Sequence, residues 1–285
     1  MNATSQSQSV SWQTAQPTMA TGLEDARLQV HHAAQLASAF GISYLPPASD
    51  DSHTNLAWNP VHAALISRDV PSAGGAVTVG LRVRDLTLFV SLAGHHVAEI
   101  ALHARTLGVA ADLLRNALGA AGLASGRYTL ERHFTLPTHP VAGGLPFNAG
   151  DAAAFNELST WFANAALELT ALASRETEAS EVRVWPHHFD MATLITLPGG
   201  RSVGAGMEPG DAYYAEPYFY VNAYPAPDAA RLTMPLGGGG TWHTHEWTGA
   251  VLPVSRLPAD PAAQQAHVRA FLDSAVTACR SFSQI

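Results

Sequence analysis

The spacing of apolar residues along this chain changes between the two periods that distinguish helices from strands. Val77, Val79 and Leu81 alternate with polar residues, as in a strand with one buried face. Residues 107–121 instead carry apolar side chains every three or four positions, as in a helix. The chain therefore reads as a mixture of both elements. We expect strands at 77–83, 86–92, 97–102, 192–197, 201–207, 218–224 and 248–254, and helices at 21–41, 107–121, 151–174 and 260–281.

These elements follow the same order twice. Residues 50–122 and residues 183–281 each read as four strands and then a helix. We therefore predict an α+β fold with two pseudo-repeated antiparallel β4α units, joined by the long helix at 151–174. In that register His53 falls opposite His188 and Asn55 opposite Asp190. A chance likeness between two ordinary antiparallel halves is the alternative interpretation.

The ends and the apolar content of the chain suggest one soluble domain. Residues 1–20 are rich in Ser, Gln and Thr and lack the charged and apolar regions of a signal peptide, so we expect a disordered leader. Residues 21–285 then form a single α+β domain. No apolar run reaches the length of a membrane span. We expect a cytoplasmic protein with no membrane association.

Composition excludes several classes of function. The net charge is -8, and the absence of a basic stripe argues against nucleic-acid binding. All 15 cationic residues are arginine, so neither a Schiff-base lysine nor a phosphate-loop lysine is available. Cys279 is the only cysteine, and its helical surroundings predict a buried structural thiol.

Two short clusters of histidine and acid carry the strongest chemical signal. One is Trp-Pro-His-His-Phe-Asp at 185–190 and the other is Trp-His-Thr-His-Glu-Trp at 242–247. If both were strands, alternate residues within each cluster would share a face. Imidazoles and carboxylates are ligands for Zn, Mn, Fe and Ni, so a divalent metal is the candidate cofactor. The predicted metal ligands are His188, Asp190, His243 and His245.

Further residues complete the predicted site. Glu216 or Glu246 would act as general base, and His187 would carry out acid–base chemistry. The aromatic and acidic stretch at 206–220 has the composition of a small-molecule pocket. The predicted pocket walls are His53, Asn55, Trp185, Asp211, Tyr214, Tyr218 and Trp242. The competing interpretation is that the histidines are hydrogen-bonded structural residues, and we expect His31 and His32 to lie on a helix surface.

Two glycine-containing motifs have simpler explanations than catalysis. Gly200-Arg-Ser-Val-Gly204 matches a nucleophile elbow, but no helix can start after Gly204, so we expect Ser202 to be a strand residue behind a hairpin turn. The run Gly237–Gly240 lacks the β-α-β context of a phosphate-binding loop. We expect this run to be a mobile loop that could cover the histidine cluster.

The motif segments resemble those of a bacterial family of uncharacterised proteins. The resemblance rests on the segments 50–56, 185–190, 210–220 and 242–247. The C-terminal half is also similar to a broader domain of unknown function, which shares the His-Phe-Asp segment and a Tyr-x-x-Ala-Tyr-Pro segment, here 220–225. The resemblance implies a shared fold and no particular activity.

These observations lead to two hypotheses of different classes. The first is a cytoplasmic, metal-dependent and hydrolase-like enzyme that acts on a small molecule. The second is a non-catalytic ligand-binding or scaffold protein with structural histidines. The sequence predicts no oligomeric state.

Overall fold

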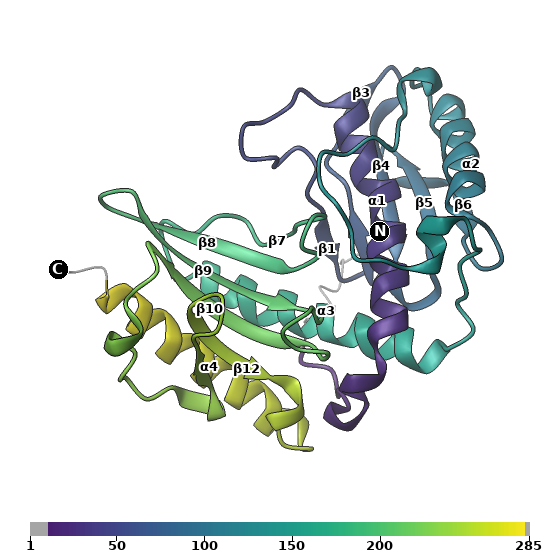
Figure 1. Ribbon diagram of the computed structural model, residues 1–285. Helices are drawn as coiled ribbons and strands as arrows, with labels where there is room; N and C mark the ends of the chain where they lie inside the picture. The colour runs from purple at the N-terminus through teal and green to yellow at the C-terminus, as the bar shows by residue number, and fades with distance from the viewer. Residues whose placement is uncertain (1–10, 283–285) are drawn as a thin grey trace, which may run out of the picture.

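The computed structural model describes residues 11–282, which form an α+β fold with four α-helices and two antiparallel sheets (Figure 1). The predicted fold class is therefore confirmed. Within these residues, no helix is both long enough and apolar enough to cross a membrane. The α-helices are α1 (Glu24–Tyr44), α2 (Leu107–Ala120), α3 (Ala152–Ala173) and α4 (Pro261–Ser281).

The first sheet has the strand order β1-β2-β4-β5-β6, with β3 also paired to β4. Its central strand β4 contains the predicted alternation, and Val77, Val79 and Leu81 are fully buried. The Thr106 hydroxyl accepts a hydrogen bond from the Val109 N–H and caps α2. The strands are β1 (Ala57–Asn59), β2 (Ala64–Ile66), β3 (Val70–Ser72), β4 (Gly75–Arg82), β5 (Thr87–Leu92) and β6 (His95–Ala101).

The second sheet has the strand order β11-β12-β10-β9-β8-β7, and α3 and α4 pack on one of its faces (Figure 1). Asp151 and Asp260 cap these two helices as their sequences suggest. Gly199 and Gly200 turn the chain at positive φ between β8 and β9, so Ser202 is a strand residue, as predicted. The strands are β7 (Arg183–Val184), β8 (Met191–Leu197), β9 (Arg201–Glu208), β10 (Tyr218–Tyr224), β11 (Thr241–His243) and β12 (Gly249–Pro253).

Within the described residues, each half of the chain contains six strands followed by a helix. Strands β1–β6 precede α2, and strands β7–β12 precede α4. The halves join where Leu56 and Val184 exchange two backbone hydrogen bonds of 3.0 and 2.8 Å. Each half therefore has two strands more than the predicted β4α unit, and the internal symmetry and the pairing of His53 with His188 stay predictions.

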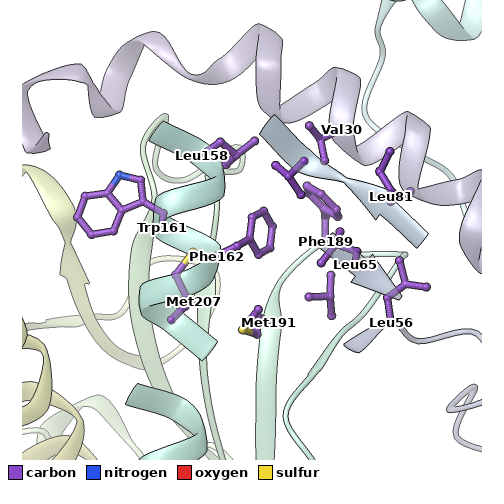
Figure 2. Close-up of a cluster of buried hydrophobic side chains, with 14 of the residues drawn as sticks. Val30, Leu56, Leu65, Leu81, Leu158, Trp161, Phe162, Phe189, Met191 and Met207 are labelled. Carbon is purple, nitrogen blue, oxygen red and sulfur yellow. The ribbon is translucent and has the colours of Figure 1, made fainter. Parts of the chain in front are cut away.

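A shared core connects the two halves (Figure 2). Phe189 lies at its centre, fully buried, with its ring edge-to-face against Phe162 of α3 at 5.4 Å. Figure 2 also shows Val30 of α1, Leu81 of the first sheet and Met191 of the second converging on this region. Helices α1 and α3 and both sheets contribute side chains to this cluster. Its burial is driven by the hydrophobic effect and therefore holds the two halves together.

The first helix differs from its prediction in its bounds and in its surroundings. It begins at Glu24, because Pro17–Gly22 form the short 3-10 helix η1, and it continues past Gly41 to Tyr44. Gly41 is not a stop signal: a Cβ there would lie 2.0 Å from the His53 carbonyl oxygen. The glycine therefore permits close approach of a neighbouring segment.

The segment 128–148 covers the polar side of α1, so the expectation that His31 and His32 lie on a helix surface is wrong. Both histidines are only 2% exposed. His32 Nε2 bonds the Pro137 carbonyl at 3.1 Å, and His139 Nε2 lies 3.2 Å from an Asp25 oxygen. Figure 1 shows this teal segment crossing α1. The sequence pattern predicts that this face of the helix contacts water. In the structure, imidazole side chains form hydrogen bonds there instead.

The predicted disordered leader is wrong for residues 11–20, which are part of the packed structure. Ala15 and Ala20 belong to the core at 2% and 0% exposure. Residues 1–10 lie outside the described residues. The composition of this segment did not signal its order because its main chain, rather than its side chains, makes most of its contacts.

Candidate functional site

The Trp185–Asp190 segment is a tight turn that leads into β8, not a strand. The Phe189 N–H donates to the Trp185 carbonyl at 2.6 Å, and the Trp185 N–H donates to the Asp190 carbonyl at 2.9 Å. Phe189 has φ of 74°, which a bulky residue adopts only under constraint. The alternation expected for His188 and Asp190 on one strand face therefore does not apply.

Helix α1 holds this turn from outside. His31 Nε2 and Gln35 Nε2 both lie 2.9 Å from the Pro186 carbonyl oxygen. Since a carbonyl only accepts, His31 carries its proton on Nε2. Its ring also stacks on Phe189 at 4.7 Å. Burial lowers the pKa of His31 to about 4, so this imidazole is neutral at physiological pH.

At the end of the turn, Asp190 is buried and bonded to a tyrosine. The Tyr220 hydroxyl of β10 donates to its carboxyl group. The Tyr220 ring crosses the open face of the second sheet over Gly206, where a Cβ would lie 2.6 Å from the phenol oxygen. Burial raises the pKa of Asp190, while the Tyr220 hydrogen bond and nearby His188 act in the opposite direction.

A second acid, Glu208, is buried beside Asp190 at the end of β9. It is 7% exposed, and no described residue donates a hydrogen bond to its carboxyl group. Burial, followed by the charges of Asp190 and Asp211, raises the pKa of Glu208 well above its usual range. Arg27 of α1 opposes this shift and itself donates to the Gly210 carbonyl at 2.5 Å.

The loop from β9 to β10 places Asp211 among three tyrosines. One Asp211 oxygen accepts the backbone N–H groups of Tyr213 and Tyr214 at 2.7 and 2.8 Å. The other accepts the Tyr218 hydroxyl at 2.7 Å. Tyr214 in turn lies 2.9 Å from His243 Nδ1. The structure therefore brings the predicted residues Asp211, Tyr214 and Tyr218 together, with Asp211 fully engaged in hydrogen bonds.

Two hollows meet at the turn. The large cleft, of about 840 Å³, lies between α1, residues 133–138, the turn and residues 210–212. The sheet hollow, of about 370 Å³, lies on the open face of β8, β9 and β10, with Gly204 and Asn222 in its lining. His187 and His188 line both hollows. Trp185, a predicted pocket residue, and Asp190, a predicted metal ligand, line the sheet hollow.

His187 and His188 differ from the structural histidine His31 in their hydrogen bonding. Within residues 11–282, no hydrogen bond reaches the side chains of Trp185, His187, His188 or Asn222, although all four line the sheet hollow. His31, by contrast, has a backbone partner in the folded chain. Polar groups that the fold leaves without partners in a hollow are available to a ligand or to water.

The four residues predicted to bind a metal do not assemble. His243 already uses both ring nitrogens, on Tyr214 and on the His245 carbonyl at 2.6 Å. The His245 side chain is 81% exposed and lies beside Glu246. Over the described part of the chain, no three His, Cys, Asp or Glu side chains are arranged to hold a metal ion. The donor set therefore does not fit a divalent metal.

The two predicted general bases have structural partners instead. Glu216 accepts the Ser255 N–H at 2.7 Å and the Ser255 hydroxyl at 2.8 Å, so it ties the start of β10 to the end of β12. Glu246 accepts the Tyr213 hydroxyl at 3.0 Å on an exposed loop. Neither residue lines either hollow. Glu216 and Glu246 both lie on loops, away from the turn. The alternation of side chains along a strand does not predict where a loop side chain points.

Three predicted pocket residues also lie elsewhere. His53 Nδ1 accepts the Ala48 N–H at 3.2 Å, and Asn55 Oδ1 accepts Arg68 Nε at 3.2 Å. Trp242 donates its indole N–H to the Met234 carbonyl at 2.9 Å. None of the three lines the large cleft or the sheet hollow, and neither do the predicted pocket residues Tyr214 and Tyr218. His53 and Trp242 bond the backbone, and Asn55 bonds an arginine side chain.

The glycine run is not a lid over the histidines. Residues Gly237–Gly239 form a 3-10 turn that packs against α4. A Cβ on Gly238 would lie 2.0 Å from the His267 carbonyl oxygen, and the Gly237 N–H donates to Ser274 Oγ at 2.8 Å. These glycines therefore allow close packing against a helix backbone.

Several site residues were not predicted, although patterns for two groups are present in the sequence. Arg27, His31 and Gln35 recur every four positions in the first helix, which places them in a polar stripe on one face. Gly204 and Gly206 alternate in β9 opposite Asn222 and Tyr220. Such glycines leave space on a sheet face. For Glu208 we find no comparable signal.

Comparisons with protein-family models, curated proteins and solved structures found no match to this chain. The resemblance of the motif segments to a bacterial family therefore stays a prediction.

Proposed function

We propose that this protein binds a small polar molecule where the large cleft meets the sheet hollow, and that His187 and His188 act on it as acid–base groups. The observation that carries the proposal is the position of these two imidazoles. They line both hollows without a hydrogen-bond partner among the described residues. A structural role for them would require partners such as those of His31.

The buried acids support catalysis rather than ligand binding alone. Burying Asp190 and Glu208 near each other is unfavourable for folding, and an acid with a raised pKa that lines a hollow, as Asp190 does, is typical of functional sites. A protonated carboxyl group can donate a proton or a hydrogen bond to a bound molecule. Asp190, bonded to Tyr220, lines the sheet hollow and can serve in that role.

His187 is the better general base of the two imidazoles. Burial lowers its pKa, with the neighbouring His188 acting in the same direction. A neutral imidazole at physiological pH can accept a proton from water or from a substrate hydroxyl group. The resulting chemistry is hydrolase-like and uses His187 as base and Asp190 as acid. No metal enters this proposal, because the described donors do not form a ligand set.

The partner and location that accompany this function are a small molecule and the cytoplasm. The net charge of -8 supports the absence of nucleic-acid binding. The alternative function is ligand binding without catalysis, which uses the same cleft and the same unpartnered side chains. The two alternatives differ in the role of Asp190, which is needed for turnover in the first and only for binding of the ligand in the second.

A matched set of variants tests the proposal. Ligand binding would be measured by thermal shift with a panel of neutral saccharides, amino acids and small carboxylic acids. Hydrolysis would be measured with alkyl esters, because their alkoxide leaving group needs a proton from a general acid. We expect at least one compound to raise the Tm of the wild type and of His95→Ala, an exposed histidine on β6 outside both hollows. The His187→Ala/His188→Ala protein should lose that response.

Asp190→Asn separates catalysis from binding. The amide keeps the size of the side chain but removes its acid function, so the panel response should remain while hydrolysis falls at least tenfold. Equal hydrolysis in this variant would exclude Asp190 as the acid, and no hydrolysis by the wild type would favour the non-catalytic alternative. An unchanged thermal shift in the double histidine variant, or no response to any compound by the wild type, would contradict the proposed site.

A further inference from the structure

The N-terminal segment Trp12–Gln16, called the arm below, lies in a groove between α3 and α4 that recognises its main chain. Asn164 of α3 accepts the Gln13 N–H at 2.8 Å and donates to the Gln13 carbonyl at 2.9 Å. Gln264 of α4 donates to the Ala15 carbonyl at 3.0 Å. Glu157 of α3 accepts the Gln16 N–H at 2.6 Å. Figure 1 shows this coil running beside α3 before it reaches α1.

The groove is built from buried polar side chains rather than from surface residues. Asn164 and Gln264 are completely buried, and Glu157 is 6% exposed. A bidentate amide pair such as Asn164 with Gln13 satisfies one N–H and one carbonyl of an extended chain together. The arm itself contributes to this burial, and its removal takes away four hydrogen bonds to its main chain, at a net cost of about 0.5–1.5 kcal/mol each. The groove therefore favours an extended peptide.

The arm contributes little side-chain specificity of its own. Its side chains at Gln13, Thr14 and Gln16 are exposed, whereas Ala15 enters the core and Trp12 bonds Gln264 Oε1 at 3.1 Å. The arm pairs with no strand. An extended segment with an aromatic residue three positions before an alanine meets every requirement of the groove.

We propose that the arm is exchangeable between molecules, so that the groove of one molecule binds residues 12–16 of a second copy. The second copy carries the same aromatic residue, the same alanine and the same main-chain groups. Exchange replaces each hydrogen bond by an identical one, which makes it a low-cost route to a dimer. The tethered arm competes at a high effective concentration, so exchange becomes visible when the intramolecular contact is blocked.

Complementary full-length variants test this inference. Ala15→Arg places a charge where Ala15 is 2% exposed, so its arm is expelled and its groove is empty. Asn164→Ala/Gln264→Ala removes the groove contacts, so its arm is free. When the two are mixed, the arm of the second should fill the groove of the first. Analytical ultracentrifugation should then show a species of twice the chain mass that neither variant forms alone.

Controls separate arm exchange from other association. Adding Ala15→Arg to the groove variant should abolish the mixed species, because no competent arm remains. If the first pair folds poorly, a milder pair is Gln13→Pro, which removes one hydrogen bond from the arm, with Asn164→Ala, which removes two from the groove. Circular dichroism would verify folding of each variant. Folded variants that stay separate on mixing would overturn the inference, and so would unfolding of even the milder pair.

Discussion

His31 Nε2 lies 2.9 Å from the carbonyl oxygen of Pro186, so a side chain of the first helix holds the turn that carries His187 and His188. The two groups are separated by more than 150 residues in the chain. The His31 ring also stacks on Phe189, the strained residue of the same turn. The candidate site therefore depends on docking of α1 against the second half of the protein.

This contact predicts a specific acid sensitivity. Folding lowers the pKa of His31 from 6.5 to about 4, so the unfolded chain binds the extra proton between these values. The stability due to neutral His31 is present above pH 6.5 and is lost as pH falls toward 4. His31→Leu should cost about 1 kcal/mol at pH 7 and should flatten the pH dependence of stability in this window.

Gln35→Leu is the matched control, because it removes the other hydrogen bond to Pro186 without removing a titratable group. Urea unfolding monitored at pH 7, 6, 5 and 4 would compare the two variants. The control should keep the acid sensitivity of the wild type between pH 6.5 and 4. The same slope in His31→Leu would show that another group titrates.

Glu208 should make the free energy of unfolding change with pH in the opposite direction. Its pKa is raised above the ordinary 4.5 by burial, so the folded state holds this proton more tightly than the unfolded state. The stability due to protonated Glu208 is present below pH 4.5 and is lost as pH rises through the raised pKa. Glu208→Gln should match the wild type at pH 4 and exceed it in unfolding free energy by about 1–3 kcal/mol at pH 8.

Glu168→Gln provides the contrast for this measurement. Glu168 is also buried but accepts two hydrogen bonds from Arg269, at 3.0 and 3.1 Å. Removing its charge should lower stability at pH 8, because a real ion pair is lost. A Glu208→Gln protein that is destabilised to a similar degree would mean that Glu208 is paired in solution.

Gly206 is predicted to be essential for the placement of Tyr220. A Cβ at this position would lie 2.6 Å from the Tyr220 phenol oxygen and 2.7 Å from the Met191 carbonyl oxygen. Gly206→Ala should cost about 1–3 kcal/mol through overpacking and should detach Tyr220 from Asp190. Gly143→Ala, with no atom within 4 Å of the added methyl group, should leave stability nearly unchanged. Thermal unfolding and tyrosine fluorescence would report both effects.

Elemental analysis gives a prediction about metal content. Protein purified without an affinity tag should contain far less than one equivalent of Zn, Mn, Fe or Ni, since the described donors form no ligand group. The measurement would be repeated after addition of each metal and gel filtration. Retention of one equivalent that is lost in His188→Ala would contradict the structural placement of these side chains.

Local patterns were sufficient for most of the secondary structure. The predicted strand 218–224 coincides with β10, and Asp151 and Asp260 cap their helices, because backbone periodicity and capping depend on near neighbours in sequence. The predicted turn at Gly199 and Gly200 follows from the freedom of glycine at positive φ. The α+β class follows from the order of these elements.

By itself, the sequence thus determined most of the elements and the fold class, whereas a functional role of the 185–190 segment stays a prediction. Only the tertiary structure decided which polar groups meet: it placed His31 under Pro186, Glu208 beside Asp190, and His243 on Tyr214 rather than on a metal. The physical reason is the distance along the chain over which each kind of interaction acts. Periodicity reports which face of an element is apolar, whereas the partner of a buried polar group is set by packing between segments far apart in the chain.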